Sequence, residues 1–83
     1  MTVAPNPTGS TAEARFSITR AGYVTLRLVD GMGREVRTVV ERGYMDEGRY
    51  AAWVDLRDLP NGVYLIEAQC DRRRESTKVV VAR

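Results

Sequence analysis

The sequence predicts an all-β protein, a sandwich of about seven antiparallel strands. Three observations support this prediction. Apolar residues recur at every second position in several short segments, and turn-forming Gly, Pro, Asn and Asp residues separate these segments at intervals of about ten residues. No stretch has helical periodicity. Short strands at this spacing are typical of an immunoglobulin-like β-sandwich.

The beginning of the chain differs in composition from the rest. Pro5 and Pro7 lie close together, and Asn, Gly and Ser residues surround them. Each proline fixes its own φ and holds the preceding residue extended. We therefore predict a linker and edge strand over residues 1–12, and one sandwich domain over residues 13–83.

Two alternating segments open the sandwich domain. From Ala14 to Thr19, apolar and polar side chains alternate, which predicts a half-buried strand that ends at Ala21-Gly22. A second strand over Val24–Leu28 leads into Asp30–Gly33. Asp-Gly favours a hairpin turn, because Gly adopts positive φ without steric cost.

The middle of the chain predicts two further strands. The third runs from about Glu35 to Glu41, and a polar loop over Gly43–Gly48 follows it. The fourth places alternate residues from Tyr50 to Val54 on its inward face, which turns Trp53 outward. A bulge would reverse that orientation, so the burial of Trp53 stays open.

The last part of the chain predicts a hairpin. Leu56–Leu59 is a connection, and Pro60-Asn61-Gly62 is a tight turn. A strand over Val63–Cys70 follows, and a charged tip over Asp71–Glu75 connects it to the final strand, Ser76–Ala82.

Composition removes most enzymatic mechanisms. The 83 residues include no His and one Cys, so a Ser-His or Cys-His pair, an internal disulfide and a thiolate zinc site are all excluded. Asp55 and Asp58 share one loop, but a chain of this size has little material for a substrate cleft around them, and Asp-rich turns are usually only turns. We predict no enzyme and no cofactor. The net charge of +2 does not indicate a nucleic-acid or membrane-surface partner.

Four segments form a recognisable pattern along the chain. They are Pro5-Asn6-Pro7; the hairpin with Asp30, Gly31, Gly33, Arg34 and Glu35; the stretch with Leu59, Gly62, Val63 and Tyr64; and the closing run Lys78, Val79, Val80 and Val81. In this order, they resemble the type A C-terminal sorting domain of the type IX (Por) secretion system. That domain is immunoglobulin-like and related to a domain of the flagellar hook-capping protein.

The resemblance implies an export function. Domains of this family end secreted proteins of Bacteroidota and direct an upstream cargo through the periplasm and outer membrane, to the cell surface or the medium. The implied partners are the type IX translocon and a sortase-like cysteine protease. The chain has no apolar run of the ~20 residues that a membrane span needs, and we expect any signal peptide to lie upstream of it.

The predicted recognition residues are Arg34 and Glu35 in the hairpin and the closing run Lys78–Val81. The closing run either completes a sheet or offers an unpaired edge to a receptor strand. Turn geometry accounts for the glycines of the motifs, and Tyr64 occupies the position of a tyrosine corner, whose hydroxyl bonds back to the chain.

The alternative function is a non-catalytic immunoglobulin-like accessory or adhesion module of an extracellular protein. Fold class does not separate the two functions, because unrelated functions share the sandwich. A carbohydrate-binding module is expected to show a row of exposed aromatic side chains, and Trp53 is one candidate for such a residue.

Overall fold

The computed structural model describes residues 1–83 and contains seven strands and no helix, so no helix is available to cross a membrane. The strands are β1 (Thr2–Ala4), β2 (Thr11–Ile18), β3 (Gly22–Asp30), β4 (Glu35–Met45), β5 (Gly48–Asp55), β6 (Gly62–Cys70) and β7 (Arg73–Val81). They form one sheet of order β1-β2-β5 and a second sheet of order β4-β3-β6-β7.

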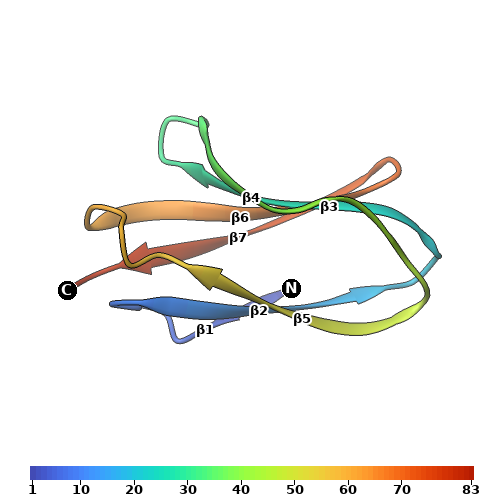
Figure 1. Cartoon of the computed structure of the whole chain (residues 1–83), viewed down its shortest axis with the longest axis horizontal. Helices are drawn as coiled ribbons and strands as arrows, with labels where there is room; N and C mark the ends of the chain where they lie inside the picture. Colours follow the sequence, from blue (N-terminus) through green and yellow to red (C-terminus); the bar gives the residue numbers. More distant parts are fainter.

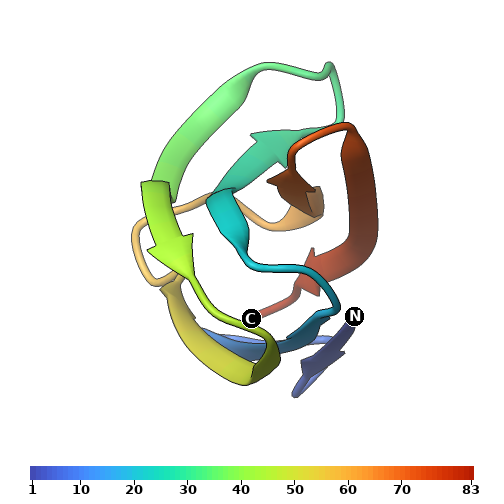
Figure 2. The same cartoon turned by 90° about the vertical axis from the view of Figure 1, so that its right-hand side faces the viewer.

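The two sheets face each other as the layers of a sandwich (Figures 1 and 2). Neighbouring strands within each sheet are antiparallel. In this order β2 pairs with β5, and β3 with β6, as the corresponding strands of immunoglobulin-like domains do. The predicted fold class is confirmed.

The core lies between the layers and consists mostly of the alternating apolar residues that the sequence predicted; it also contains Leu56, which was predicted only as part of a connection, and Ala12, which was placed in the linker and edge strand. Thirteen buried residues form one cluster, and its largest fully buried members include Leu26, Leu28, Leu56 and Ile66. Full burial of one such side chain stabilises the fold by about 1.5–3 kcal/mol relative to leaving it exposed. Period-two patterning places these side chains on the inward faces because successive strand residues point to opposite sides.

The structure corrects the predicted bounds of two strands. β4 continues to Met45, so the loop predicted over Gly43–Gly48 is wrong, and only Asp46 and Glu47 lie between β4 and β5. The pairing of β4 with β3 contains several register shifts, and Arg42 has a φ of 43°. Such irregularities break the alternation by which a strand is detected in a sequence.

β7 also begins earlier than predicted, at Arg73 instead of Ser76. Only Asp71 and Arg72 form the hairpin turn, and Asp71 adopts a φ of 55°. The first residues of β7 are charged and exposed, so the strand has no apolar pattern there although its backbone pairs with β6.

Trp53 points outward from β5 and is 64% exposed. The unbroken pairing of β5 with β2 preserves the alternation, so the predicted orientation of this side chain is confirmed. Two other exposed aromatic residues, Tyr23 and Tyr44, form an edge-to-face pair between β3 and β4 in the other sheet. The exposed aromatic side chains are thus divided between the two sheets and do not form a row.

Candidate recognition surface

The four motif segments gather at one end of the sandwich (Figure 1). We call this the motif end and define it by the residues Pro5–Gly9, Asp30–Glu35, Leu56–Tyr64 and Lys78–Arg83. The turns that connect β2 to β3, β4 to β5 and β6 to β7 lie at the opposite end. Segments that are far apart in the sequence therefore meet in one small region.

Asn6 fixes the segment between β1 and β2 to the last strand. Its side-chain Nδ2 donates to the carbonyl oxygen of Lys78 at 2.8 Å, and its Oδ1 accepts from the backbone N–H of Val80 at 2.9 Å. One amide thus satisfies both a donor and an acceptor on the outer edge of β7. The amide substitutes for a neighbouring strand at this point of the sheet.

Thr8 extends the same contact through its backbone. Its N–H donates to the carbonyl of Val80, and its carbonyl accepts from the N–H of Ala82, each at 2.9 Å. The Thr8 side chain is buried, and its hydroxyl donates to the carbonyl of Thr11 at 2.6 Å. Together with Asn6, this contact pairs the outer edge of β7 from Lys78 to Ala82, so this part of the terminal strand completes a sheet.

The predicted closing run has two inward and two outward residues. Val79 and Val81 are buried in the core, whereas Lys78 is exposed and Val80 half-buried on the outer face of the sheet. Val80 pairs across the sheet with Val63, which is 49% exposed. Only the outward residues are accessible to another protein while the domain is folded.

The side chain of Arg83 holds the end of the chain against the loop before β6. Its guanidinium donates to the carbonyls of Gly9 at 2.9 Å, Leu59 at 2.5 Å and Leu56. Its backbone N–H donates to Oδ1 of Asn61 at 3.2 Å. A guanidinium with several donors in one plane suits such a convergence of carbonyl groups.

The β3–β4 turn is organised by Asp30. Its Oδ1 accepts from the backbone N–H groups of Met32 and Arg34 at 2.9 and 3.0 Å. These bonds, with the Arg34 backbone contact first, hold the pKa of Asp30 below its ordinary value. Gly33 has a φ of 82°, a conformation that glycine adopts without steric cost. Gly31 does not have a positive φ, so the positive φ predicted for the Asp-Gly pair is wrong and occurs two residues later.

Arg34 and Glu35 do not pair with each other. Arg34 Nε lies 3.1 Å from Oδ2 of Asp30, and Glu35 Oε1 lies 3.5 Å from Nη1 of Arg27. Both side chains are exposed at the motif end. An exposed ion pair contributes only about 0–1 kcal/mol.

Tyr64 forms the predicted tyrosine corner. Its hydroxyl donates to the carbonyl of Pro60 at 2.7 Å, and its ring is buried in the core. The hydrogen bond ties the Pro-Asn-Gly turn to the strand that follows it. This prediction from the sequence is confirmed.

The two carboxylates considered for chemistry are bound by arginines. Nη2 of Arg37 donates to both carboxylate oxygens of Asp58, at 3.0 and 2.8 Å. Nε and Nη2 of Arg57 donate to Oδ1 and Oδ2 of Asp55, each at 2.9 Å. The side-chain bonds from Arg57 are the main reason that the pKa of Asp55 lies well below its ordinary value. Asp55 is the last residue of β5 and not part of the loop with Asp58, and both carboxylates serve as partners in ion pairs.

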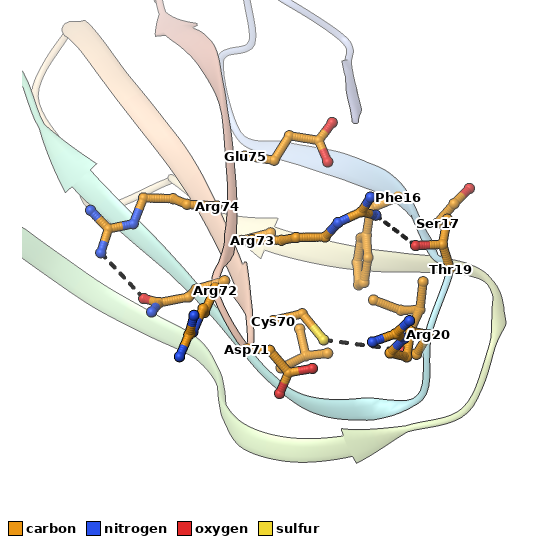
Figure 3. Close-up of a pocket in the computed structure, with 14 residues that line it drawn as sticks. Phe16, Ser17, Thr19, Arg20, Cys70, Asp71, Arg72, Arg73, Arg74 and Glu75 are labelled. Carbon is orange, nitrogen blue, oxygen red and sulfur yellow. Dashed lines mark hydrogen bonds between the residues drawn. The ribbon is translucent and has the colours of Figure 1, made fainter.

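A groove of about 830 Å³ lies at the opposite end, between β2 and the β6–β7 hairpin (Figure 3). Arg73 extends across it, and its Nη1 donates to the hydroxyl of Thr19 at 2.7 Å. The half-buried thiol of Cys70 lies in the groove wall, beside the core. Arginine, aspartate and glutamate side chains all line the groove, and none of the four motif segments reaches it.

The fold and the motif end together define a class of protein, a small immunoglobulin-like domain whose first and last segments are bonded to each other. The chain belongs to the secretion system C-terminal sorting domain family, whose model matches residues 2–82. The domain is a C-terminal signal for type IX secretion of an attached cargo, which implies recognition by that machinery and export to the cell surface or the medium. A comparison with curated protein sequences finds no match.

Sequence reasoning missed the contacts that organise the motif end. It identified Asn6 as a motif residue but assigned it no bond, and it gave Arg83 no role. A bond between Asn6 and Lys78 joins residues 72 positions apart, so no local pattern reveals it. The proline on each side of Asn6 is the one local signal that this residue is held in a fixed conformation.

Proposed function

We propose that the type IX translocon recognises the folded motif end and not a free C-terminal tail. The observation that carries this proposal is the bonding of the Pro-Asn-Pro segment to β7, because it fixes the two outward residues of the closing run in one surface. Lys78 and Val80 lie there beside Val63, on the outer face of the four-stranded sheet. Arg34 and Glu35 add exposed charge at the same end.

This surface has the composition that a protein partner recognises. Val63 and Val80 supply a small apolar area, and Lys78 and Arg34 place positive charge around it. Apolar contact at the centre with charge at the rim is the usual arrangement of specific interfaces. The domain itself performs no chemistry in this proposal, and it uses no cofactor.

We also propose a route by which the cargo is exported. The cargo crosses the inner membrane by a signal peptide and reaches the periplasm, where the sorting domain folds and the translocon binds it. A sortase-like cysteine protease then removes the domain and attaches the cargo to the cell surface. The cargo precedes the predicted linker and edge strand, residues 1–12, which pair with the rest of the sandwich domain, residues 13–83.

The test is a fusion of a signal peptide, a reporter and residues 1–83, expressed in a host that has type IX secretion. We expect the reporter on the cell surface or in the medium, and we expect it to stay in the periplasm when Lys78–Arg83 are deleted. A fusion without the domain is the control. Periplasmic retention of the complete fusion would refute the proposed function.

A further inference from the structure

The sandwich has four edge strands, and three of them are protected against pairing with another chain. β1 has only three residues. β4 is irregular in its pairing with β3 and carries Glu35, Arg37, Glu41 and Arg42. β7 is covered by Asn6 and Thr8 over its second half, and its first half begins with Arg73, Arg74 and Glu75. Short length, irregularity, charge and covering segments are the devices that protect edges.

The fourth edge, on β5, has none of these devices along most of its length. β5 pairs with β2 in a continuous register without a bulge, and it contains no proline. Arg49 and Asp55 are its only charged residues. Regular edges of this kind are templates for the addition of a further strand.

The direction of each backbone group of β5 follows from one hydrogen bond. The N–H of Leu56 donates to the carbonyl of Ser10 at 2.8 Å, which continues the β2–β5 ladder by one residue. Because hydrogen-bonded and non-bonded pairs alternate between antiparallel strands, even-numbered residues of β5 bond to β2. The N–H and C=O groups of Arg49, Ala51, Trp53 and Asp55 therefore point away from the sheet.

Arg37 limits this free edge at one end. Its Nη1 donates to the carbonyl of Asp55, so that acceptor is already occupied by a side chain from β4. The outward residues whose N–H and C=O groups are both free are Arg49, Ala51 and Trp53. An incoming strand has three consecutive outward residues to pair with.

We propose that this edge pairs with the same edge of a second copy of the chain, antiparallel and about a two-fold axis at Ala51. Only this register pairs Arg49, Ala51 and Trp53 of one copy with the same three residues of the other, and it avoids the occupied carbonyl of Asp55. It places Ala51 opposite Ala51, and Arg49 of each copy opposite Trp53 of the other. The two three-stranded sheets become one continuous sheet.

The side chains on the outer face fit this arrangement. Directly opposed residues have Cβ atoms about 4.5–5.5 Å apart, so the Arg49 guanidinium reaches the exposed face of Trp53 in a cation–π contact. The small Ala51 side chains meet without steric conflict at the axis. A contact of so few residues buries less surface than the roughly 1,200 Å² of stable complexes, so the association is weak and reversible. The proposed self-association through β5 does not depend on the export function.

The experiment measures the mass of the wild-type chain by sedimentation over a concentration series that extends into the millimolar range. We expect the apparent mass to rise toward that of a dimer. In the same series, backbone amide resonances of Ala51 and Trp53 shift with concentration, whereas those of Ala52 and Val54, which bond to β2, do not. A wild-type chain that stays monomeric at every concentration overturns the proposal. The β5 edge would then pair with a strand of another protein or stay unpaired.

Two charge variants test the two-fold axis. Ala51→Lys and Ala51→Glu each place like charges opposite each other, so each variant alone stays monomeric. An equimolar mixture of the two forms a dimer again, because the opposed charges are then complementary. Both changes are at an exposed position, and thermal unfolding confirms that each variant is folded. If either variant associates as strongly as the wild type, the contact lies elsewhere and the proposal fails.

Discussion

Replacement of Asn6 by alanine is the most informative perturbation of the motif end. Alanine removes both side-chain bonds to β7, the one to the Lys78 carbonyl at 2.8 Å and the one from the Val80 N–H at 2.9 Å. A net contribution of about 0.5–1.5 kcal/mol for each bond gives an expected loss of about 1–3 kcal/mol. Asn6 is exposed and water replaces part of its bonding, so we expect the lower half of that range.

The assay is thermal and urea unfolding of the 83-residue chain, followed by circular dichroism or fluorescence of Trp53. A loss of 1 kcal/mol lowers the midpoint temperature of a domain of this size by about 4–8 °C. Asn6→Asp is the matched variant. It keeps an acceptor for the Val80 N–H but turns a charged oxygen toward the Lys78 carbonyl, so at neutral pH it is also less stable than the wild type.

Two results would refute this reasoning. If Asn6→Ala unfolds within about 0.5 kcal/mol of the wild type, the effect does not exceed that of an ordinary surface substitution. If Asn6→Asp is as stable as the wild type, the amide does not donate to the Lys78 carbonyl. In either case, the Pro-Asn-Pro segment does not hold β7 in place.

Three further predictions concern single groups at the motif end. Tyr64→Phe removes the hydroxyl bond to the Pro60 carbonyl and lowers the free energy of unfolding by about 0.5–1.5 kcal/mol; an unchanged midpoint in urea would contradict the tyrosine corner. Gly33→Ala forces a side chain into a φ of 82° and lowers the free energy of unfolding by about 1–3 kcal/mol. Gly31→Ala changes a turn glycine without positive φ, so in the same assay it lowers the free energy of unfolding by less. The lowered pKa of Asp30 contributes stability above the pKa of an unfolded aspartate, about 3.9, and this contribution is lost as the pH falls through the lower pKa of the folded state. Between pH 5 and pH 2, roughly the range in which carboxylates take up protons, Asp30→Asn therefore loses less stability than the wild type; parallel pH profiles of the two would show that the turn does not bind the carboxylate.

The sequence predicted the sandwich because its determinants are local. The alternation of Phe16 and Ile18 with polar residues, and the turn residues between the strands, depend on neighbours in the chain and on the two-residue period of a strand. The orientation of Trp53 followed from the same period. These features are visible before any tertiary contact is known.

The parts that the sequence did not predict depend on contacts between distant residues. The extension of β4 to Met45 is concealed by bulges, which shift the alternation without leaving a local signal. The roles of Asn6 and Arg83 depend on bonds to strands and loops that only the fold brings close. The sequence placed all four residues of the closing run, Lys78–Val81, among the recognition residues, and only the packing shows that Val79 and Val81 belong to the core.

The central claim is that the outward surface of the folded motif end is the export signal. The most direct test compares the exported fraction of a reporter fused to the wild-type domain with that of the Lys78→Glu and Val80→Asp double variant. Ser76→Glu is the matched control, because Ser76 lies on the same strand and is exposed outside the motif end. We predict that the double variant stays folded but that its reporter accumulates in the periplasm, while the control is exported like the wild type. Normal export of the double variant would contradict the claim.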